Sequence, residues 1–523
     1  MLHTVDISIF IAYVCGLLVL ALWISRNEAN HERNTEDYFL ASKSLPWWAI
    51  GASLIASNIS AEQIIGMSGS GFAMGLAIAS YEWMAALTLI VVGKYLLPIF
   101  LKNEIYTMPQ YLEQRFDNKV KTTLAVFWIV VYVFVNLTAV LWLGGLAIES
   151  VAGVDALFGM IFLALFSIAY SLYGGLKAVA FTDILQVVLL VFGGLLLSYI
   201  ALDKIADGEG LLIGFGILTD KLPGHFDMIL SPDNPFYKDL PGISVLIGGM
   251  LVMNFSYWGF NQYIIQRALA AKDIKEAQKG IAFAAYLKIL MPLIVVLPGI
   301  AAVVLYPDIS RPDLAYPTMM NLMPIGIKGL VFAALVAAIV SSLASMTNSI
   351  STIFTMDLYS QLKPKESQKH YVFVGRMATL ISLIIGLIMA EPLLGKFEQA
   401  FQYIQEFTGF FTPGITVIFL LGMFYKGTTA QGALSAAVGS AVLSFALMML
   451  WPELPFMDRV GLVFLLCIVL ALVVSFITKP SANAINTDHS VDLSQVSFAT
   501  STGFNLSALG VVVILTALYT FWW

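Results

Sequence analysis

Three ionisable side chains lie inside apolar stretches of this sequence, where a charge costs several kcal/mol unless it meets a partner or a ligand. Glu82 and Lys288 carry opposite charges, each within the first third of its stretch. They could form a structural ion pair between two helices, or line a polar cavity and hydrogen-bond a bound molecule. Asp183 lies near the end of a third stretch. It could line an ion path, and a capping or interfacial role is an equal alternative.

Three further pairs of residues are spaced by one helical turn and so share a helix face. The pairs are Gln63 with Met67, Asn254 with Tyr257, and Phe401 with Gln405. Amides supply hydrogen-bond donors and acceptors together, and an aromatic ring can stack on the C–H face of a sugar. Any single pair is also explained by polar contacts that hold two helices together. The three pairs taken with Glu82 and Lys288 favour a site for a neutral polyhydroxyl ligand.

Small and hydroxyl side chains make up another face. Ala338, Ser341 and Ser342 have the spacing i, i+3, i+4, which alone is typical of close helix packing. Elsewhere, the apolar stretch 47–70 reads ASNIS at residues 56–60, too polar for a lipid-facing helix. A helix broken there would free backbone carbonyls. Carbonyl and hydroxyl oxygens together suit a hard monovalent cation, because divalent ions normally take carboxylates.

The elements that must position these residues are membrane helices. The 523 residues are 59% hydrophobic and 11% charged, and no soluble domain of this size is so apolar. About 14 stretches reach the roughly 20 apolar residues that a crossing helix needs. We therefore predict an all-α polytopic membrane protein whose surroundings are a lipid bilayer. The sequence has no basic run typical of nucleic-acid binding, and it lacks metal-spaced His or Cys clusters, a P-loop and a nucleophile elbow, so we expect no enzyme.

Charge predicts the orientation. Nineteen of the 27 Lys and Arg residues fall on one side of the predicted spans, which is the cytoplasmic side and leaves both termini outside. Two groups of five helices are expected to form an inverted repeat, and each opens with a helix that is polar at mid-depth, at Asn58 in the first and at residues 254–257 in the second. Such paired interrupted helices point to a transporter binding site. The expected divisions are an extra helix and loop at 1–46, the first repeat at 47–202, an external loop at 203–240, the second repeat at 241–426, two peripheral helices at 427–478, a linker at 479–502 and a last helix at 503–523.

Several motifs resemble the solute:sodium symporter family. They are DYFLA at 37–41, LPWW at 45–48, GASL at 51–54, NISA at 58–61, GGLKAV at 174–179, TDILQ at 182–186, QRALAAK at 266–272, SSL at 341–343 and TMDLY at 355–359. The resemblance covers nearly the whole chain and is specific in aggregate. It implies a LeuT-like fold, with ten core helices in two inverted repeats of five, one helix before them and three after.

The resemblance also implies ligands and gates. Sodium, as the co-transported ion with no organic cofactor, would be held by the carbonyls of Ala56, Ile59 and Ala338 and the hydroxyls of Ser341 and Ser342. A hexose, with galactose placed before glucose, would be hydrogen-bonded by Gln63, Glu82, Asn254, Lys288 and Gln405, with Asn58 close by. The inner gate would be Tyr257, and the outer gate would be formed by Met67, Tyr81 and Phe401.

Two positions depart from the family pattern. Asn261 stands where members commonly have Asp, which removes a possible cation partner, and Ala344 stands where members that carry two sodium ions tend to have Thr. We therefore expect one sodium per sugar, imported by alternating access across a bacterial inner membrane. Proline, pantothenate or another small solute is the alternative substrate. A transporter-like sensor is a further alternative, although the short linker and single last helix leave no room for a signalling domain.

Overall fold

The computed structural model describes residues 2–28, 45–103, 108–173, 176–269, 271–478, 493 and 496–523. Most of these residues are helical, and among them extended backbone pairs only in an isolated parallel bridge between Leu45 and Ala271. The DYFLA motif, the two glycines of GGLKAV and most of the predicted linker lie outside the described residues.

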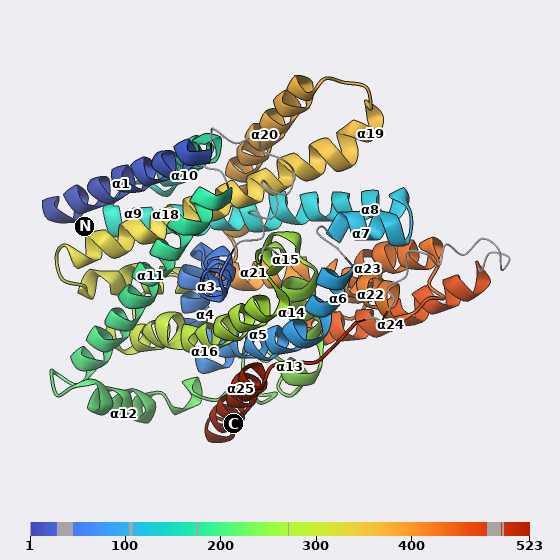
Figure 1. Ribbon diagram of the computed structural model, residues 1–523. Coiled ribbons are helices and arrows are strands. Elements are labelled where there is room, and N and C mark those ends of the chain that lie inside the picture. The colour runs from blue at the N-terminus through green and yellow to red at the C-terminus, as the bar shows by residue number, and fades with distance from the viewer. Residues whose placement is uncertain are drawn as a thin grey trace.

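Long helices surround a centre of shorter ones (Figure 1). The long helices are α1 (Thr4–Glu28), α10 (Ala156–Tyr173), α11 (Leu176–Ile205), α16 (Ile274–Leu305), α18 (Ile327–Thr352), α20 (Gln368–Leu394), α23 (Ala430–Leu450), α24 (Phe456–Ile477) and α25 (Thr502–Phe521). The shorter α-helices are α3 (Trp47–Asn58), α4 (Ser68–Met74), α5 (Ser80–Val91), α6 (Leu97–Lys102), α7 (Met108–Arg115), α8 (Asn118–Val130), α9 (Thr138–Ala152), α12 (Leu211–Lys221), α13 (Ser244–Ile247), α14 (Gly249–Phe255), α15 (Gln262–Leu269), α17 (Ala315–Met319), α19 (Ser360–Leu362), α21 (Ala400–Thr408) and α22 (Thr412–Phe424).

Wide and tight helical turns join these elements. The π-helical segments are η2 (Glu62–Met67), η4 (Val92–Leu96), η5 (Val131–Leu137), η7 (Ser256–Phe260) and η10 (Ile353–Tyr359). The 3-10 segments are η3 (Gly75–Ala79), η6 (Pro223–His225), η8 (Pro312–Leu314) and η9 (Met320–Leu322). π-helical turns often accompany functional sites. Here η2, η5 and η7 all contribute to the pocket described below.

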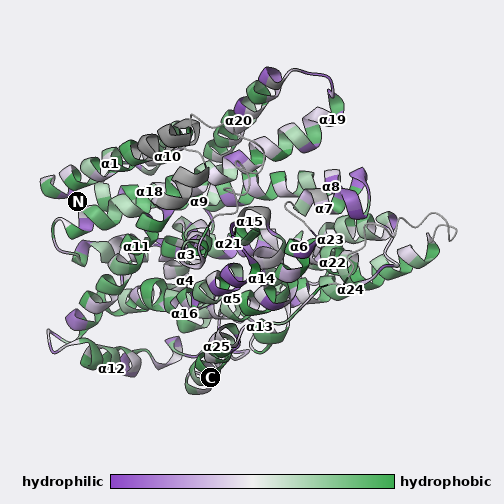
Figure 2. Cartoon of the chain, in the orientation of Figure 1, coloured by the Kyte–Doolittle hydropathy of each residue, from purple (hydrophilic) through white to green (hydrophobic). Residues whose placement is uncertain are grey.

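Each predicted span coincides with a helix or a run of consecutive helices. In the described part of the chain, nine such runs are long and apolar enough to cross a membrane, and α21 with α22, bent by 45°, can form a tenth. About fourteen crossings and the division into two repeats stay predictions. The helices differ in how far they are buried inside the protein. In the run 327–362, 89% of the most apolar 18-residue stretch is buried, whereas in α25 the share is 17%. Figure 2 accordingly shows hydrophobic residues along the outer helices and hydrophilic ones gathered at many of the loops.

The first predicted break is present but lies slightly later than expected. The α3 helix continues to Asn58, Ile59 is extended (φ −71°, ψ 104°), and helix resumes at Ala61. The Ser60 hydroxyl accepts a hydrogen bond from the Glu62 backbone N–H at 3.2 Å, so Ser60 caps the new segment. The prediction that the break begins at Ala56 was wrong. Ala56 lies in the last turn of α3, where helix carbonyls lack helical partners.

The second helix is interrupted at Asn261, and not at the predicted stretch 254–257. Asn254 remains helical because its side-chain amide donates to the Met250 carbonyl one turn earlier (3.1 Å). The chain then widens into η7 before Asn261 adopts an extended conformation (φ −79°, ψ 120°). A polar residue that bonds its own helix does not break it, which explains the displacement.

Candidate functional site

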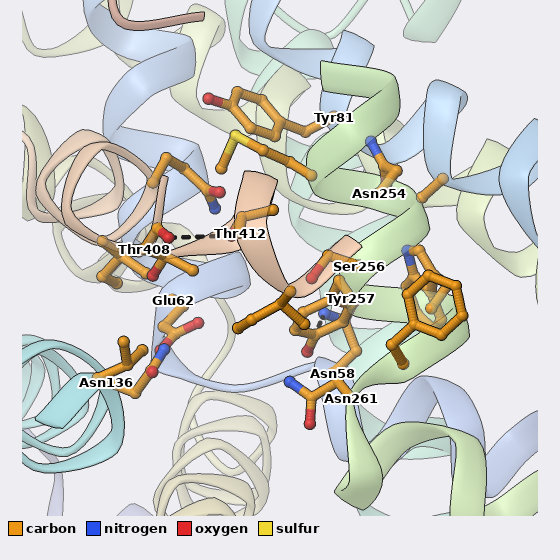
Figure 3. A pocket seen from close by; sticks show the side chains of 18 of the residues that line it. Asn58, Glu62, Tyr81, Asn136, Asn254, Ser256, Tyr257, Asn261, Thr408 and Thr412 are labelled. Carbon is orange, nitrogen blue, oxygen red and sulfur yellow. Dashed lines mark hydrogen bonds between the residues drawn. The ribbon is translucent and has the colours of Figure 1, made fainter. Parts of the chain in front are cut away.

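One pocket lies between the two interrupted helices, with about 1010 Å³ of empty space including its open mouth. Its walls come from α3, η2, α5, α8, η5, α14, η7, α16, α21 and α22, and Figure 3 shows polar side chains pointing into it from several of these elements. The lining includes every residue predicted to bind sugar, which are Asn58, Gln63, Glu82, Asn254, Lys288 and Gln405. It also includes three of the four predicted gate residues, which are Tyr81, Tyr257 and Phe401.

The predicted pair of opposite charges is present. The Lys288 ammonium lies 2.5 Å from the Glu82 carboxylate, and the two side chains are 1% and 4% exposed. Lys288 also donates to the side-chain oxygen of Asn58 and lies 5.1 Å from the centre of the Trp258 ring. The ion pair therefore lies in the wall of the pocket, which joins the two interpretations made from the sequence.

Asn58 connects this pair to the predicted inner gate. Its amide nitrogen donates to the Tyr257 hydroxyl at 3.0 Å, while its oxygen accepts from Lys288. A continuous chain of polar contacts thus runs from Glu82 through Lys288 and Asn58 to Tyr257. It links α5, α16, α3 and η7, so a ligand that competes for any of these groups acts on all four elements.

The amides provide unused hydrogen-bonding capacity. Gln63 is 5% exposed, and its side-chain oxygen has no partner among the described residues. Buried polar atoms are nearly always satisfied, so this acceptor fits a hydroxyl donor from a ligand or water. Asn254 uses one of its two amide hydrogens on the Met250 carbonyl, which leaves the other hydrogen and the side-chain oxygen available to a ligand. Gln405 is half-buried in the same lining.

Two of the predicted outer-gate residues meet directly. The Tyr81 and Phe401 rings make an edge-to-face contact with centroids 5.0 Å apart, which closes one end of the pocket. Met67 is fully buried in η2 and is absent from the lining. Its predicted place in the gate surface is not seen.

A buried carboxylate in η8 fixes the start of α21, the helix that carries Phe401. Asp313 in η8 is fully buried, and its carboxylate accepts a hydrogen bond from the Ala400 N–H at 3.0 Å. Burial raises the pKa of Asp313 to about 7, against the lowering effects of that hydrogen bond and of Arg311. Arg311 itself donates to the backbone carbonyls of Leu394 and Phe397.

The residues predicted to hold sodium are all buried but lie outside the pocket lining. They are Ala56, Ile59, Ala338, Ser341 and Ser342. The Ser341 hydroxyl donates to the Asp183 carboxylate at 2.6 Å, and Arg267 lies 4.0 Å from the other oxygen of that carboxylate. Asp183 is 3% exposed and lies within α11, and its place in an ion path and the capping or interfacial alternative stay predictions. A cation cage at these five residues stays a prediction.

Several polar groups that line the pocket were not among the predicted site residues, and they include Glu62, Tyr132, Asn136 and Thr408. Glu62 accepts from the Asn136 amide at 3.4 Å, and the Tyr132 hydroxyl donates to Asn261 at 3.1 Å. Glu62 could have been found, because it is a charged residue within an apolar stretch and directly follows the break. Tyr132 and Asn136 carry no such signal, since only the fold turns η5 toward the break.

Comparison with known proteins agrees with this geometry. The family model described as "Sodium:solute symporter family" matches residues 38–439. The "Sodium/glucose cotransporter" of Vibrio parahaemolyticus is 51% identical over 100% of this chain and 99% of its own. The "Sodium/myo-inositol cotransporter 2" of Sus scrofa is 33% identical over 86% of this chain and 70% of its own.

Solved structures match the fold. A Na+-coupled sialic acid symporter in a substrate-bound outward-open state has a TM-score of 0.77 at 23% identity, covering 91% of this chain and 99% of its own. Mhp1, a nucleobase-cation-symport-1 family transporter in a closed conformation, has a TM-score of 0.54 at 16% identity, covering 87% and 99%. The fold is LeuT-like. The chain belongs to the sodium:solute symporter family, a family of sodium-coupled secondary transporters.

Proposed function

We propose that this symporter imports a hexose together with one sodium ion by alternating access. Galactose is the preferred candidate, and glucose is the second. The observation that carries the proposal is the chain of contacts from Glu82 through Lys288 and Asn58 to Tyr257 in one pocket wall. It presents charged and neutral hydrogen-bonding groups beside aromatic rings, which suits adjacent hydroxyls and the C–H face of a pyranose. The printed name of the Vibrio relative, a sodium/glucose cotransporter, supports a hexose.

The charge balance of the pocket favours a neutral ligand. A carboxylate substrate such as proline would need an unpaired cation or a helix N-terminus. Among the described residues that line the pocket Lys288 is the one cationic side chain, Glu82 neutralises it at 2.5 Å, and Glu62 adds a second carboxylate that would repel an anion. An amino-acid or pantothenate carboxylate would have to displace Glu82. A hexose needs only to share the network.

Coupling is proposed to pass through the break after Asn58. The carbonyls of Ala56 and Ile59 would bind sodium on one side of this segment. Asn58 and Gln63 would hydrogen-bond the sugar on the other side. One sodium moving across about 100 mV releases roughly 2.3 kcal/mol, and a tenfold concentration ratio adds about 1.4 kcal/mol. Together these would sustain a sugar gradient of a few hundredfold. Ala344, which lacks a hydroxyl, supports one ion per sugar.

The proposed setting is a bacterial inner membrane with both termini on the periplasmic side, as the distribution of Lys and Arg indicates. The test is uptake of labelled galactose into proteoliposomes under an inward sodium gradient, with glucose, myo-inositol and proline as unlabelled competitors. We expect glucose to compete and proline to have no effect. Inhibition by proline but not by glucose would overturn the hexose assignment.

A further inference from the structure

The pocket extends beyond the residues that address the hexose in the proposed function. Across the pocket from the Asn58–Tyr257 hydrogen bond, its lining also includes Glu62, Asn136 and Thr408. Figure 3 shows Glu62 next to Asn136 and below Thr408, with Tyr257 across the pocket. These three side chains come from η2, η5 and the end of α21, so the fold brings them together from separate segments.

Glu62 differs from Glu82 in its charge partner. Glu82 is neutralised by Lys288, whereas among the described residues no Lys, Arg or His lies within 4 Å of the Glu62 carboxylate. Its one printed hydrogen bond, from the Asn136 amide, is long at 3.4 Å. A carboxylate at membrane depth normally has a partner or a function. The missing partners of Glu62 are therefore hydrogen-bond donors that enter the pocket.

Neighbouring groups indicate the chemistry of that ligand. The Thr408 hydroxyl is buried without a partner in the described part of the chain, and the Asn136 side chain offers both a donor and an acceptor. The rings of Trp128 and Phe411 line the same pocket. A carboxylate, an amide, a hydroxyl and flanking aromatic faces repeat the set of groups found around Glu82. That set suits a polyhydroxyl ring better than a bare cation, which would need several converging oxygens.

We propose that Glu62, Asn136 and Thr408 form a second hexose subsite beside the Glu82–Lys288 network in the same pocket. The inference rests on the proposed function. On the predicted orientation the subsite lies at mid-depth, because Glu62 directly follows the break after Asn58 and is next to Gln63 in η2. Two vicinal hydroxyls would donate to the two oxygens of Glu62, and the Asn136 amide would bind a third.

The test is equilibrium dialysis of labelled galactose against the purified full-length protein in detergent with saturating sodium. We expect the wild type to bind two molecules per chain at saturation. Glu62→Gln keeps the shape of the side chain but removes a charged hydrogen-bond acceptor. The affinity for the second galactose should therefore fall tenfold or more. The affinity of the first event should stay within about twofold. Asn136→Ala should weaken the second event in the same direction, and Glu149→Gln, an exposed glutamate at the end of α9, is the matched control that should bind two.

Three results would overturn the subsite. They are a wild type that binds a single galactose, a Glu62→Gln protein that binds two as tightly as the wild type, and a Glu62→Gln protein that keeps both sugars but needs more sodium, which would make Glu62 an ion ligand. Failure of the proposed function is distinct. It would be seen as a wild type that binds no galactose and shows no sodium-driven uptake.

Discussion

The buried ion pair gives the sharpest separation between a structural role and a binding role. Removing one partner, by Lys288→Met, leaves the Glu82 carboxylate 4% exposed and without its cation. Breaking a buried pair in this way typically costs about 3–5 kcal/mol, whereas replacing both partners with uncharged residues is often nearly neutral. We therefore expect Lys288→Met to lower the free energy of unfolding by about 3 kcal/mol or more. The double variant Glu82→Gln/Lys288→Met should recover most of that loss.

Galactose uptake should respond differently. Lys288→Met, Glu82→Gln and the double variant should all lose sodium-driven uptake, because each change removes part of the network proposed to hydrogen-bond the sugar. The assays are thermal unfolding of the purified protein, followed by tryptophan fluorescence, and uptake in proteoliposomes. Lys279→Met is the matched control on the same helix. Its partner Glu276 lies at 3.0 Å but Lys279 is 54% exposed, so the change should cost less than about 1 kcal/mol. A double variant that transports like the wild type would refute the reasoning, because the pair would then be purely structural.

Three other predictions concern the proposed sodium site at Ser342, the buried Asp313 carboxylate and the helix packing at Gly299. Ser342→Ala should raise the sodium concentration for half-maximal uptake about fivefold, the equivalent of one lost ligand worth about 1 kcal/mol, and unchanged sodium activation would remove Ser342 from the cage. Because the folded-state pKa of Asp313 is raised to about 7, the folded protein binds more protons than the unfolded chain between about pH 4 and 7, so stability should fall as pH rises through this window. Asp313→Asn should flatten that profile in melting experiments, and an unaltered profile would contradict the assignment. Gly299→Ala would place a Cβ 2.1 Å from the Ser68 carbonyl and should destabilise by at least 1–3 kcal/mol, while Gly216→Ala, with open space around it, should melt like the wild type.

Much of the fold could be predicted from hydrophobicity, since long apolar runs at membrane depth leave helix as the available structure. The polar interruption after Asn58 and the meeting of Glu82 with Lys288 were also predictable, because a buried charge requires a partner. Pairs at one-turn spacing then placed Gln63, Asn254 and Gln405 correctly in one pocket.

The sequence could not specify which hydrogen-bond donor pairs with which acceptor. Ser341 was predicted as a sodium ligand from its own helix face, and the spacing gave no sign that its hydroxyl donates to Asp183 from another helix. The second interruption moved to Asn261 because Asn254 bonds its own helix, a choice that depends on rotamer and not on residue type. The approach of Asn136 to Glu62 depends on the packing of η5 against the broken helix, and periodicity carries no information about it.

The central claim is that sodium drives hexose import through this pocket. The most direct measurement is the initial rate of labelled galactose uptake into proteoliposomes, with an inward sodium gradient and with equal sodium on both sides, for the wild type and for Gln63→Ala. We predict accumulation in the wild type only when the gradient is present, and none in the variant. Galactose accumulation that is independent of sodium, or normal uptake by Gln63→Ala, would contradict this account.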